Sequence, residues 1–176
     1  MSGDVVLLTG LPSLLARAVC TEVLARDAEA RVEAIVRPKF MEEARAALDA
    51  LPAADRRRAH VIEGDAAAID LGLSGAEFKL LTSEVTRIHH CAQVTYLGVD
   101  AKTAEHVNVG GTSEIVELAA SCRDLACLVF HSTAHVSGDR RGVVLEDELK
   151  KGQSFRSVVE DTKARAEKVA RAAMPR

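Results

Sequence analysis

Short apolar runs alternate along this chain with longer segments of helical periodicity, and this alternation restricts the fold more than any other feature. Residues 5–8 are all apolar, which is typical of a strand buried on both faces of a parallel sheet. We expect further strands at residues 32–36, 60–62, 85–91 and 125–130. Because parallel strands need crossover connections, the pattern predicts an α/β fold, a Rossmann-like doubly wound parallel sheet in the order 3-2-1-4-5.

The segments between these strands carry apolar residues on single helical faces. One face comprises Phe40, Ala44, Ala47, Leu48 and Leu51, and another comprises Val107, Gly111, Ile115, Leu118 and Cys122. A last helix is expected from Ser157, because Ser157 and Glu160 form a capping-box pattern. Residues 52–58 are predicted to be a polar loop.

The length of 176 residues predicts one domain, residues 1–176. Sheets of this type normally continue into a sixth strand, so we expect a sheet truncated at one edge, in a fragment or in a minimal protein without the substrate-binding portion.

A net charge of −3 argues against nucleic acid or an anionic membrane as a partner. No apolar run approaches the roughly 18 residues of a membrane span. The start of the chain lacks a signal-peptide pattern, and we expect a cytoplasmic protein.

Four cysteines form no Cys-x-x-Cys pair and lie in apolar stretches, so we expect buried thiols and no metal or disulfide. They are Cys20, Cys91, Cys122 and Cys127. His89 and His90 lie on an expected strand without a set of metal-ligating partners.

The first strand is followed by a turn that resembles a damaged dinucleotide-binding turn. Such a turn needs a glycine for the tight bend, a second for close approach of the pyrophosphate, and a third, or an alanine, for helix packing. Gly10 and Ala16 meet the first and third needs, but Ser13 stands at the second. Pro12 suits a first helical turn that leaves N–H groups free for an anion. The alternative is an ordinary corner between a strand and a helix.

The second strand ends at Arg37, where an acid would bind the adenosine ribose. An arginine there suits a 2′-phosphate, and hence NADP(H) over NAD(H). The alternative is a solvated arginine at a strand end.

Five motifs in order along the chain resemble the extended short-chain dehydrogenase/reductase family. Within it they are most similar to the fatty-acyl-CoA and carrier-protein thioester reductases, in which a Gly-Asp followed by Asp-Leu-Gly-Leu-Ser is typical. The motifs are Gly64-Asp65, Asp70-Leu71-Gly72-Leu73-Ser74, His90-Cys91-Ala92-Gln93-Val94, Asn108-Val109-Gly110-Gly111-Thr112 and His131-Ser132-Thr133-Ala134-His135-Val136-Ser137-Gly138.

The resemblance implies a role for each matched position. Thr133 would hold the substrate carbonyl, Lys163 would grip the nicotinamide ribose, and Asn108 would support the site. The cofactor-binding residues that the turn, the second strand and the resemblance together imply are Thr9, Gly10, Leu11, Ser13, Leu14, Arg37, Asp65, Ala66, Cys91, Ala92, Gln93, Asn108 and Lys163.

The proton donor of this family is a tyrosine four residues before the lysine, one helical turn away. That position here is Val159, and valine transfers no proton. Tyr96, the only tyrosine, and His135 are the candidate substitutes. Lys163 has an alternative interpretation as part of a solvated helix face with Asp161, Arg165 and Glu167.

These observations leave three hypotheses for function. The first is a degenerate NADP-binding reductase domain, a pseudoenzyme that acts as a binding or interaction module, with a homodimer expected through the 107–122 helix and the Lys163 helix. The second is an active NADPH-dependent oxidoreductase of acyl thioesters or other carbonyls with a displaced proton donor. The third is a structural fragment of a larger multidomain reductase. Two departures from the family, Ser13 and Val159, favour the first.

Overall fold

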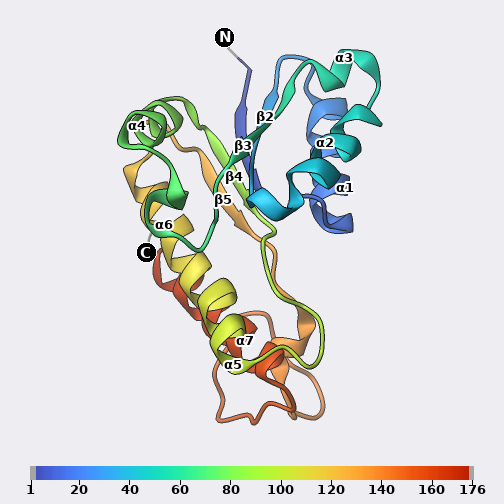
Figure 1. The fold of residues 1–176 in the computed structure, drawn as a ribbon. Helices are drawn as coiled ribbons and strands as arrows, with labels where there is room; N and C mark the ends of the chain where they lie inside the picture. Colours follow the sequence, from blue (N-terminus) through green and yellow to red (C-terminus); the bar gives the residue numbers. More distant parts are fainter. Residues whose placement is uncertain (1–2, 175–176) are drawn as a thin grey trace.

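A computed structural model describes residues 3–174, and the expectations that concern Met1, Ser2, Pro175 and Arg176 lie outside this range. The chain forms a five-stranded parallel sheet in the order β3-β2-β1-β4-β5, as predicted (Figure 1). Its strands are β1 (Val5–Thr9), β2 (Arg31–Val36), β3 (Ala59–Glu63), β4 (Arg87–His90) and β5 (Cys127–Phe130).

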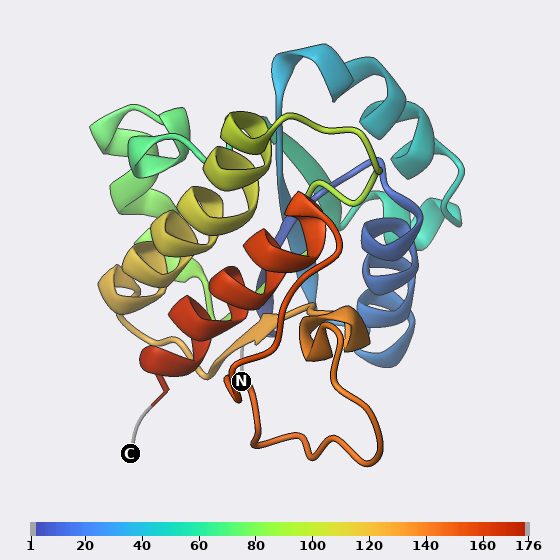
Figure 2. The same cartoon turned by 90° about the horizontal axis from the view of Figure 1, so that it is seen from below.

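Helices cover both faces of this sheet (Figures 1 and 2). One face carries α1 (Leu14–Arg26), α2 (Met41–Asp49) and α3 (Ala53–Arg56). The other carries α4 (Gly75–Glu84), α6 (Gly111–Ser121) and α7 (Val158–Ala172). The shorter helical segments are η1 (Pro38–Phe40), η2 (Ile69–Gly72), α5 (Ala101–Ala104), η3 (Glu105–Gly110) and η4 (Ala134–Ser137).

Two apolar cores result because side chains on a strand alternate between the faces of the sheet. From β1, Val6 and Leu8 pack into the core under α1 and α2. Leu7 enters the opposite core, where it joins Ile88 of β4 and Ile115 of α6. The helical faces expected around Ala44 and Ile115 are therefore the buried ones.

Three sequence-based boundaries were wrong. The fourth strand begins at Arg87, since the N–H of Val85 caps α4 by donating to the carbonyl of Leu81. The fifth begins at Cys127 rather than at residue 125. The expected polar loop at residues 52–58 contains α3, and Arg58 after it donates to the carbonyls of three distant residues, Leu24, Asp27 and Ala30.

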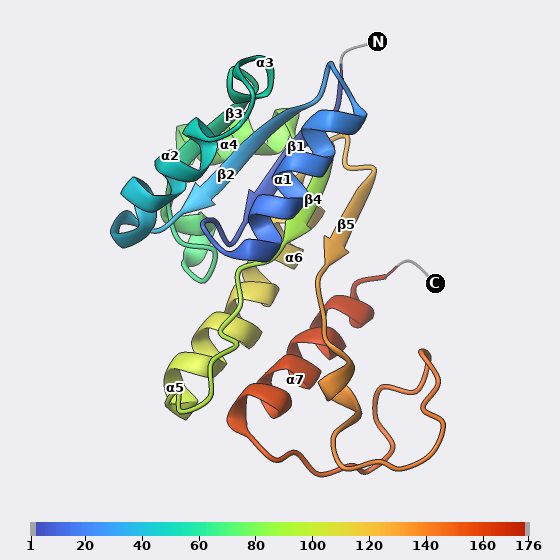
Figure 3. The same cartoon turned by 90° about the vertical axis from the view of Figure 1, so that its right-hand side faces the viewer.

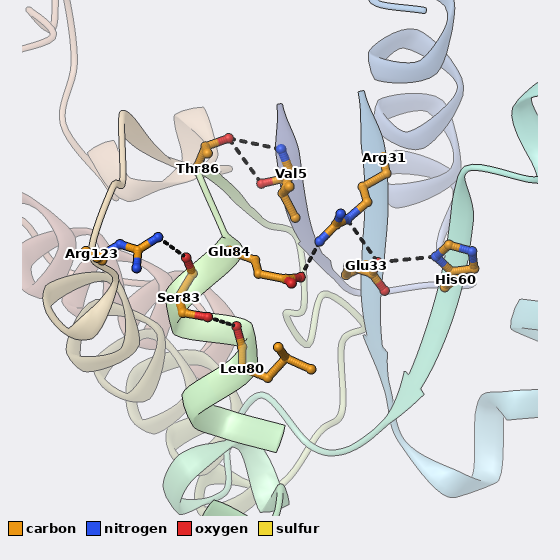
Figure 4. Close-up of polar contacts among 9 residues, drawn as sticks. All are labelled: Val5, Arg31, Glu33, His60, Leu80, Ser83, Glu84, Thr86 and Arg123. Atoms are coloured by element: carbon orange, nitrogen blue, oxygen red, sulfur yellow. Dashed lines mark hydrogen bonds and ion pairs between the residues drawn. The ribbon is translucent and has the colours of Figure 1, made fainter. Parts of the chain in front are cut away.

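Polar contacts tie the amino ends of the strands together (Figure 4). The hydroxyl of Thr86 accepts from the N–H of Val5 at 3.0 Å. Arg31 on β2 lies between Glu33 and Glu84 and forms ion pairs with both. These contacts stabilise the amino end of the sheet.

The strand β5 lies at the edge of the sheet and pairs with β4 alone among the described residues (Figure 3). No helix between residues 3 and 174 has the length and apolar composition to cross a membrane.

Candidate functional site

A cleft of about 360 Å³ lies at the carboxyl ends of β1 to β4. This is the place where ligands bind in open parallel sheets, at the point where strand order reverses. The cleft is lined by Gly10, Leu11, Pro12, Ser13, Ile35, Arg37, Phe40, Gly64, Asp65, Ala66, Ala67, Cys91, Ala92, Gln93, Val94, Thr95, Tyr96 and Val107.

The first turn of the cleft depends on Gly10. Its φ is +99°, and a Cβ at this position would lie 2.6 Å from the carbonyl carbon of Cys91. No larger residue fits there, so the turn after β1 can approach the chain after β4 closely.

Ser13 is the N-cap of α1, and its hydroxyl accepts from the N–H of Ala16 at 3.3 Å. The helix begins at Leu14, so the expectation that Pro12 occupies its first turn was wrong. The start of α1 presents N–H groups without helical partners at the cleft. Ser13 also lines the cleft, and its hydroxyl retains a proton that can be donated to a ligand.

The loop after β3 turns back on itself and presents Asp65 and Ala66 to the cleft. The N–H of Asp65 donates to the carbonyl of Leu71 at 2.8 Å, and the Asp65 carboxylate accepts from Ala67 at 3.0 Å. Asp70 and Leu71 both have positive φ, which is strained for residues other than glycine. The side chain of Leu71 is buried in the core, and this burial offsets the strain. The Asp-Leu-Gly-Leu-Ser motif therefore holds in place the loop that lines the cleft, and its serine, Ser74, caps α4.

At the end of β2, Arg37 reaches the cleft together with Phe40. Sequence reasoning identified the arginine but missed Phe40 and Lys39, which lie beside it on η1. The Arg-Pro-Lys-Phe spacing was the available signal, since one turn of 3₁₀-helix brings positions three apart to the same side.

Gln93 carries a side-chain nitrogen that is buried and has no hydrogen-bond partner among the described residues. Such a donor is costly unless a ligand accepts from it. The cleft thus combines a close-approach glycine, a helix amino terminus, a cation and an unpaired buried donor. These residues fit a dinucleotide.

Four residues expected to bind the cofactor do not line the cleft: Thr9, Leu14, Asn108 and Lys163. Thr9 is fully buried and does not line the cleft. Its hydroxyl instead accepts from the N–H groups of Cys91 and Ala92 and lies 2.9 Å from Nδ1 of His90. Thr9 therefore braces the cleft floor from below. Leu14 is 77% exposed and lies outside the lining, because it begins α1 on the solvent side.

His90 extends this bracing to α6. It is fully buried, and its Nε2 lies 3.4 Å from the hydroxyl of Thr112, which donates to the carbonyl of Asn108 at 2.7 Å. Burial, with the nearby charges of His131 and Lys163, lowers the pKa of His90 to about 4. The ring is neutral at physiological pH, and sequence reasoning had assigned it no role.

Asn108 joins the cleft to α7 rather than lining the cleft itself. Its side-chain oxygen accepts from the N–H of Val94 at 2.8 Å, and its amide donates to the carbonyl of Val94 and to the hydroxyl of Thr162. Asn108 was expected to support the site, and these hydrogen bonds show which groups it connects: Val94 at the cleft and Thr162 on α7. Thr162, which sequence reasoning missed, lies next to Lys163 on α7.

Lys163 is only 8% exposed, and burial lowers the pKa of its ammonium. The alternative of a solvated helix face therefore fails for Lys163 and for Glu167, which is equally buried. It holds for Asp161 and Arg165, which form a surface ion pair. The charge of Lys163 contributes to the lowered pKa of His90. Lys163 does not line the cleft.

Val159 is partly buried and packs against the apolar cluster of Val94, Val99 and Ala104. An apolar contact occupies the position at which the resemblance places a phenol. This part of the site has no group at that position that can transfer a proton.

The other expected catalytic residues are not gathered around Val159. Thr133 caps η4 by accepting from the N–H of His135, and it lines a separate hollow of about 690 Å³ beside α7. His135 is exposed and outside both cavities. Tyr96 lies at the rim of the cleft and is 61% exposed.

Residues 3–174 contain no cluster of three or more His, Cys, Asp or Glu side chains suited to a metal ion.

The fold and the cleft together define a Rossmann-like dinucleotide-binding domain. More narrowly, the chain belongs to the NAD-binding family described as male sterility protein, whose model matches residues 8–176.

A named relative and solved structures agree with this family. The fatty acyl-CoA reductase wat of Drosophila melanogaster is 30% identical over 118 residues, which is 67% of this chain and 22% of that protein. The terminal R domain of the myxalamid PKS-NRPS pathway superposes with a TM-score of 0.85 at 30% identity, over 98% of this chain and 46% of that one. The chain thus spans less than half the length of either.

A likeness in fold extends to another enzyme class. A UDP-glucuronic acid 4-epimerase variant from Bacillus cereus, solved with NAD, gives a TM-score of 0.74 at 20% identity. It covers 96% of this chain and 52% of that one.

Proposed function

We propose that this domain binds NADP(H) in preference to NAD(H) and does not itself reduce carbonyl compounds, so that it acts as a nucleotide-binding and interaction module. The observation that carries the proposal is Val159, which is partly buried against apolar side chains where the family resemblance requires a proton-donating tyrosine. A positioned general acid is typically worth about 10²–10⁴ in rate.

The preference for NADP(H) is supported by Arg37. Its side chain lines the cleft at the end of β2, and no carboxylate within residues 3–174 forms an ion pair with it. A cation with no internal partner is available for a 2′-phosphate, whereas an acid would bind the free ribose hydroxyls of NAD(H).

The positions of the two candidate substitute proton donors, His135 and Tyr96, support the absence of catalysis. His135 is exposed and outside the cleft, and Tyr96 stands at its rim. Neither shares a cavity with Thr133. When bound, the dinucleotide would supply hydride; the residues of this chain would then orient it through Gly10 and Ser13 and hold its adenosine end through Arg37.

An active reductase with a displaced donor remains the second candidate, because Lys163 keeps a buried position one helical turn from Val159. The relatives are longer than this chain, so participation in a larger multidomain reductase is the third candidate. The free cysteines, with Cys20 and Cys91 buried, support a cytoplasmic location.

The test is a calorimetric titration of the domain with NADPH and with NADH. We expect tighter NADPH binding, and Arg37→Ala should weaken it by about 1–3 kcal/mol while leaving NADH binding unchanged. Arg45→Ala, which removes an exposed arginine of α2 outside the cleft, is the matched control. Equal affinities for the two cofactors would reject the assignment of Arg37, and binding of neither would favour a purely structural domain.

A further inference from the structure

The single turn η1 places an aromatic ring beside two cations at the edge of the cleft. Pro38 begins the turn, and the N–H of Phe40 donates to the carbonyl of Arg37 at 2.9 Å. Side chains three residues apart eclipse one another in a 3₁₀-turn, so Arg37 and Phe40 are brought together.

Both cations lie within cation–π range of this ring. The guanidinium carbon of Arg37 is 5.2 Å from the ring centroid of Phe40, and Nζ of Lys39 is 4.8 Å from it. The limit for a favourable interaction is about 6 Å. Within the described part of the chain, neither cation forms a salt bridge with a carboxylate.

The ring itself is anchored. Phe40 is half-buried, packs against the core under α1 and α2, and lines the cleft. A fixed ring face therefore holds two long, flexible side chains that would otherwise sample many rotamers. Holding them in place before a ligand arrives reduces the entropy lost on binding.

We propose that Phe40 is a specificity-determining positioning residue, whose ring presents Arg37 and Lys39 together to a phosphomonoester on the ribose of the bound nucleotide. This inference rests on the proposed preference for NADP(H) and extends it in two respects. Lys39 becomes the second cation of the phosphate site, and Phe40 acts on the phosphate only through the two cations.

The test uses adenosine 2′,5′-bisphosphate and 5′-AMP as probes, because the pair differs only in the 2′-phosphate. Phe40→Leu keeps an apolar side chain in the core but removes the π face. It should weaken binding of the bisphosphate about five- to tenfold more than binding of 5′-AMP, the combined effect of two exposed cation–π contacts. Phe40→Tyr keeps the ring and should bind both probes as the natural chain does.

A double-mutant cycle then separates positioning from packing. Lys39→Gln should weaken the bisphosphate alone, and its effect should shrink when Phe40→Leu is already present, because the two residues act together. Equal weakening of both probes by Phe40→Leu would mean that the ring is only structural and would overturn the inference. If the natural chain itself fails to prefer the bisphosphate, the proposed cofactor preference falls as well, and that result is seen before any variant is made.

Discussion

Oγ1 of Thr9 and Nδ1 of His90 lie 2.9 Å apart in the core, at the ends of β1 and β4. The Thr9 oxygen already accepts from the N–H groups of Cys91 and Ala92, so its own proton is free to be donated to Nδ1. The proton of the neutral ring must then be on Nε2, which faces the hydroxyl of Thr112. The hydroxyl of Thr112 in turn donates to Asn108. One tautomer of His90 satisfies every group in this chain.

The first prediction is a loss of stability in acid that depends on His90. The pKa of its ring is about 4 when folded, against 6.5 for the ordinary residue, so the unfolded chain binds a proton that the folded chain does not. Stability is complete above about pH 6.5 and falls as the pH decreases towards 4, by an amount on the order of 3 kcal/mol. Urea unfolding across this range measures it.

Two variants test the assignment to His90. His90→Gln should flatten this dependence, whereas His89→Gln, on the same strand, should leave most of it in place. His89 and His131 also have lowered pKa values and contribute with the same sign, so the comparison of the two variants is decisive. Parallel curves for the natural chain and His90→Gln would rule out this role.

The second prediction concerns the link that Asn108 makes between the cleft and α7. Asn108→Ala leaves the N–H and carbonyl of Val94 without partners, and each buried unpaired group costs about 1–3 kcal/mol. We expect the free energy of unfolding to fall by about 2–4 kcal/mol. Asn108→Asp keeps the acceptor for the Val94 N–H but loses the donor to the Val94 carbonyl and to Thr162 and buries an ionisable carboxylate, so the free energy of unfolding should fall at least as far. Hydrogen exchange at Val94 reads the local effect, and unchanged protection in Asn108→Ala would refute the link.

The third prediction is that Ser13→Gly strengthens cofactor binding. Removing the side chain opens the approach to the pyrophosphate, while loss of the N-cap hydroxyl costs only a few tenths of a kcal/mol when glycine replaces serine. Titration with NADPH and thermal unfolding separate the two effects. A fall in affinity would instead identify the Ser13 hydroxyl as a phosphate ligand and the turn as adapted.

The fourth prediction concerns catalysis at Val159. We expect no NADPH oxidation by the natural chain with acyl thioesters or aldehydes. Val159→Tyr restores a phenol four residues before Lys163, and together with Ser13→Gly it should give detectable turnover if a substrate-binding segment is present. Val159→Phe supplies the same ring without the hydroxyl and should stay inactive. Activity in the natural chain that disappears in Tyr96→Phe or His135→Ala would reveal a relocated acid.

The fifth prediction is a homodimer through α6 and α7, which lie side by side on one face of the molecule (Figure 2). Sedimentation velocity at micromolar concentration should detect it. Ala120→Glu on α6 should dissociate the dimer by introducing a charge, whereas Ala76→Glu on α4 should not. A monomer at every concentration tested would count against this interface.

The sheet was predictable from sequence because apolar runs report strands that are buried on both faces. The cleft followed from Gly10 and from motifs that fall at strand ends. At two of the failed boundaries a hydrogen bond decided the outcome, one of them local and the other between residues far apart in the chain. Val85 looked like strand but caps a helix, and the polar segment 52–58 forms α3 next to Arg58, which bonds carbonyls of the first helix and the turn after it.

In the site, too, some residues could be identified from sequence and others only from the folded structure. Arg37 was found because a strand end is visible in sequence, whereas the aromatic partner of its guanidinium, Phe40, depends on the conformation of η1. Thr9 was expected to face the ligand but is turned inward by His90, 81 residues away. Alternating polarity shows that a residue is buried, but it does not show which distant polar group it contacts.

The order of strands in the sheet also has a consequence for the way in which the chain folds. β1 pairs with β2, which lies next in the chain, and also with β4, so Val6 has Val32 on one side and Arg87 on the other. Closing the second pairing brings together segments about as far apart as Thr9 and His90, and a long loop must lose entropy before any contact compensates for it. We expect the strands β1 to β3 to pair early and the junction of β1 with β4 to form late. The cleft is built across that junction, so it becomes able to bind a nucleotide only in the last stage of folding.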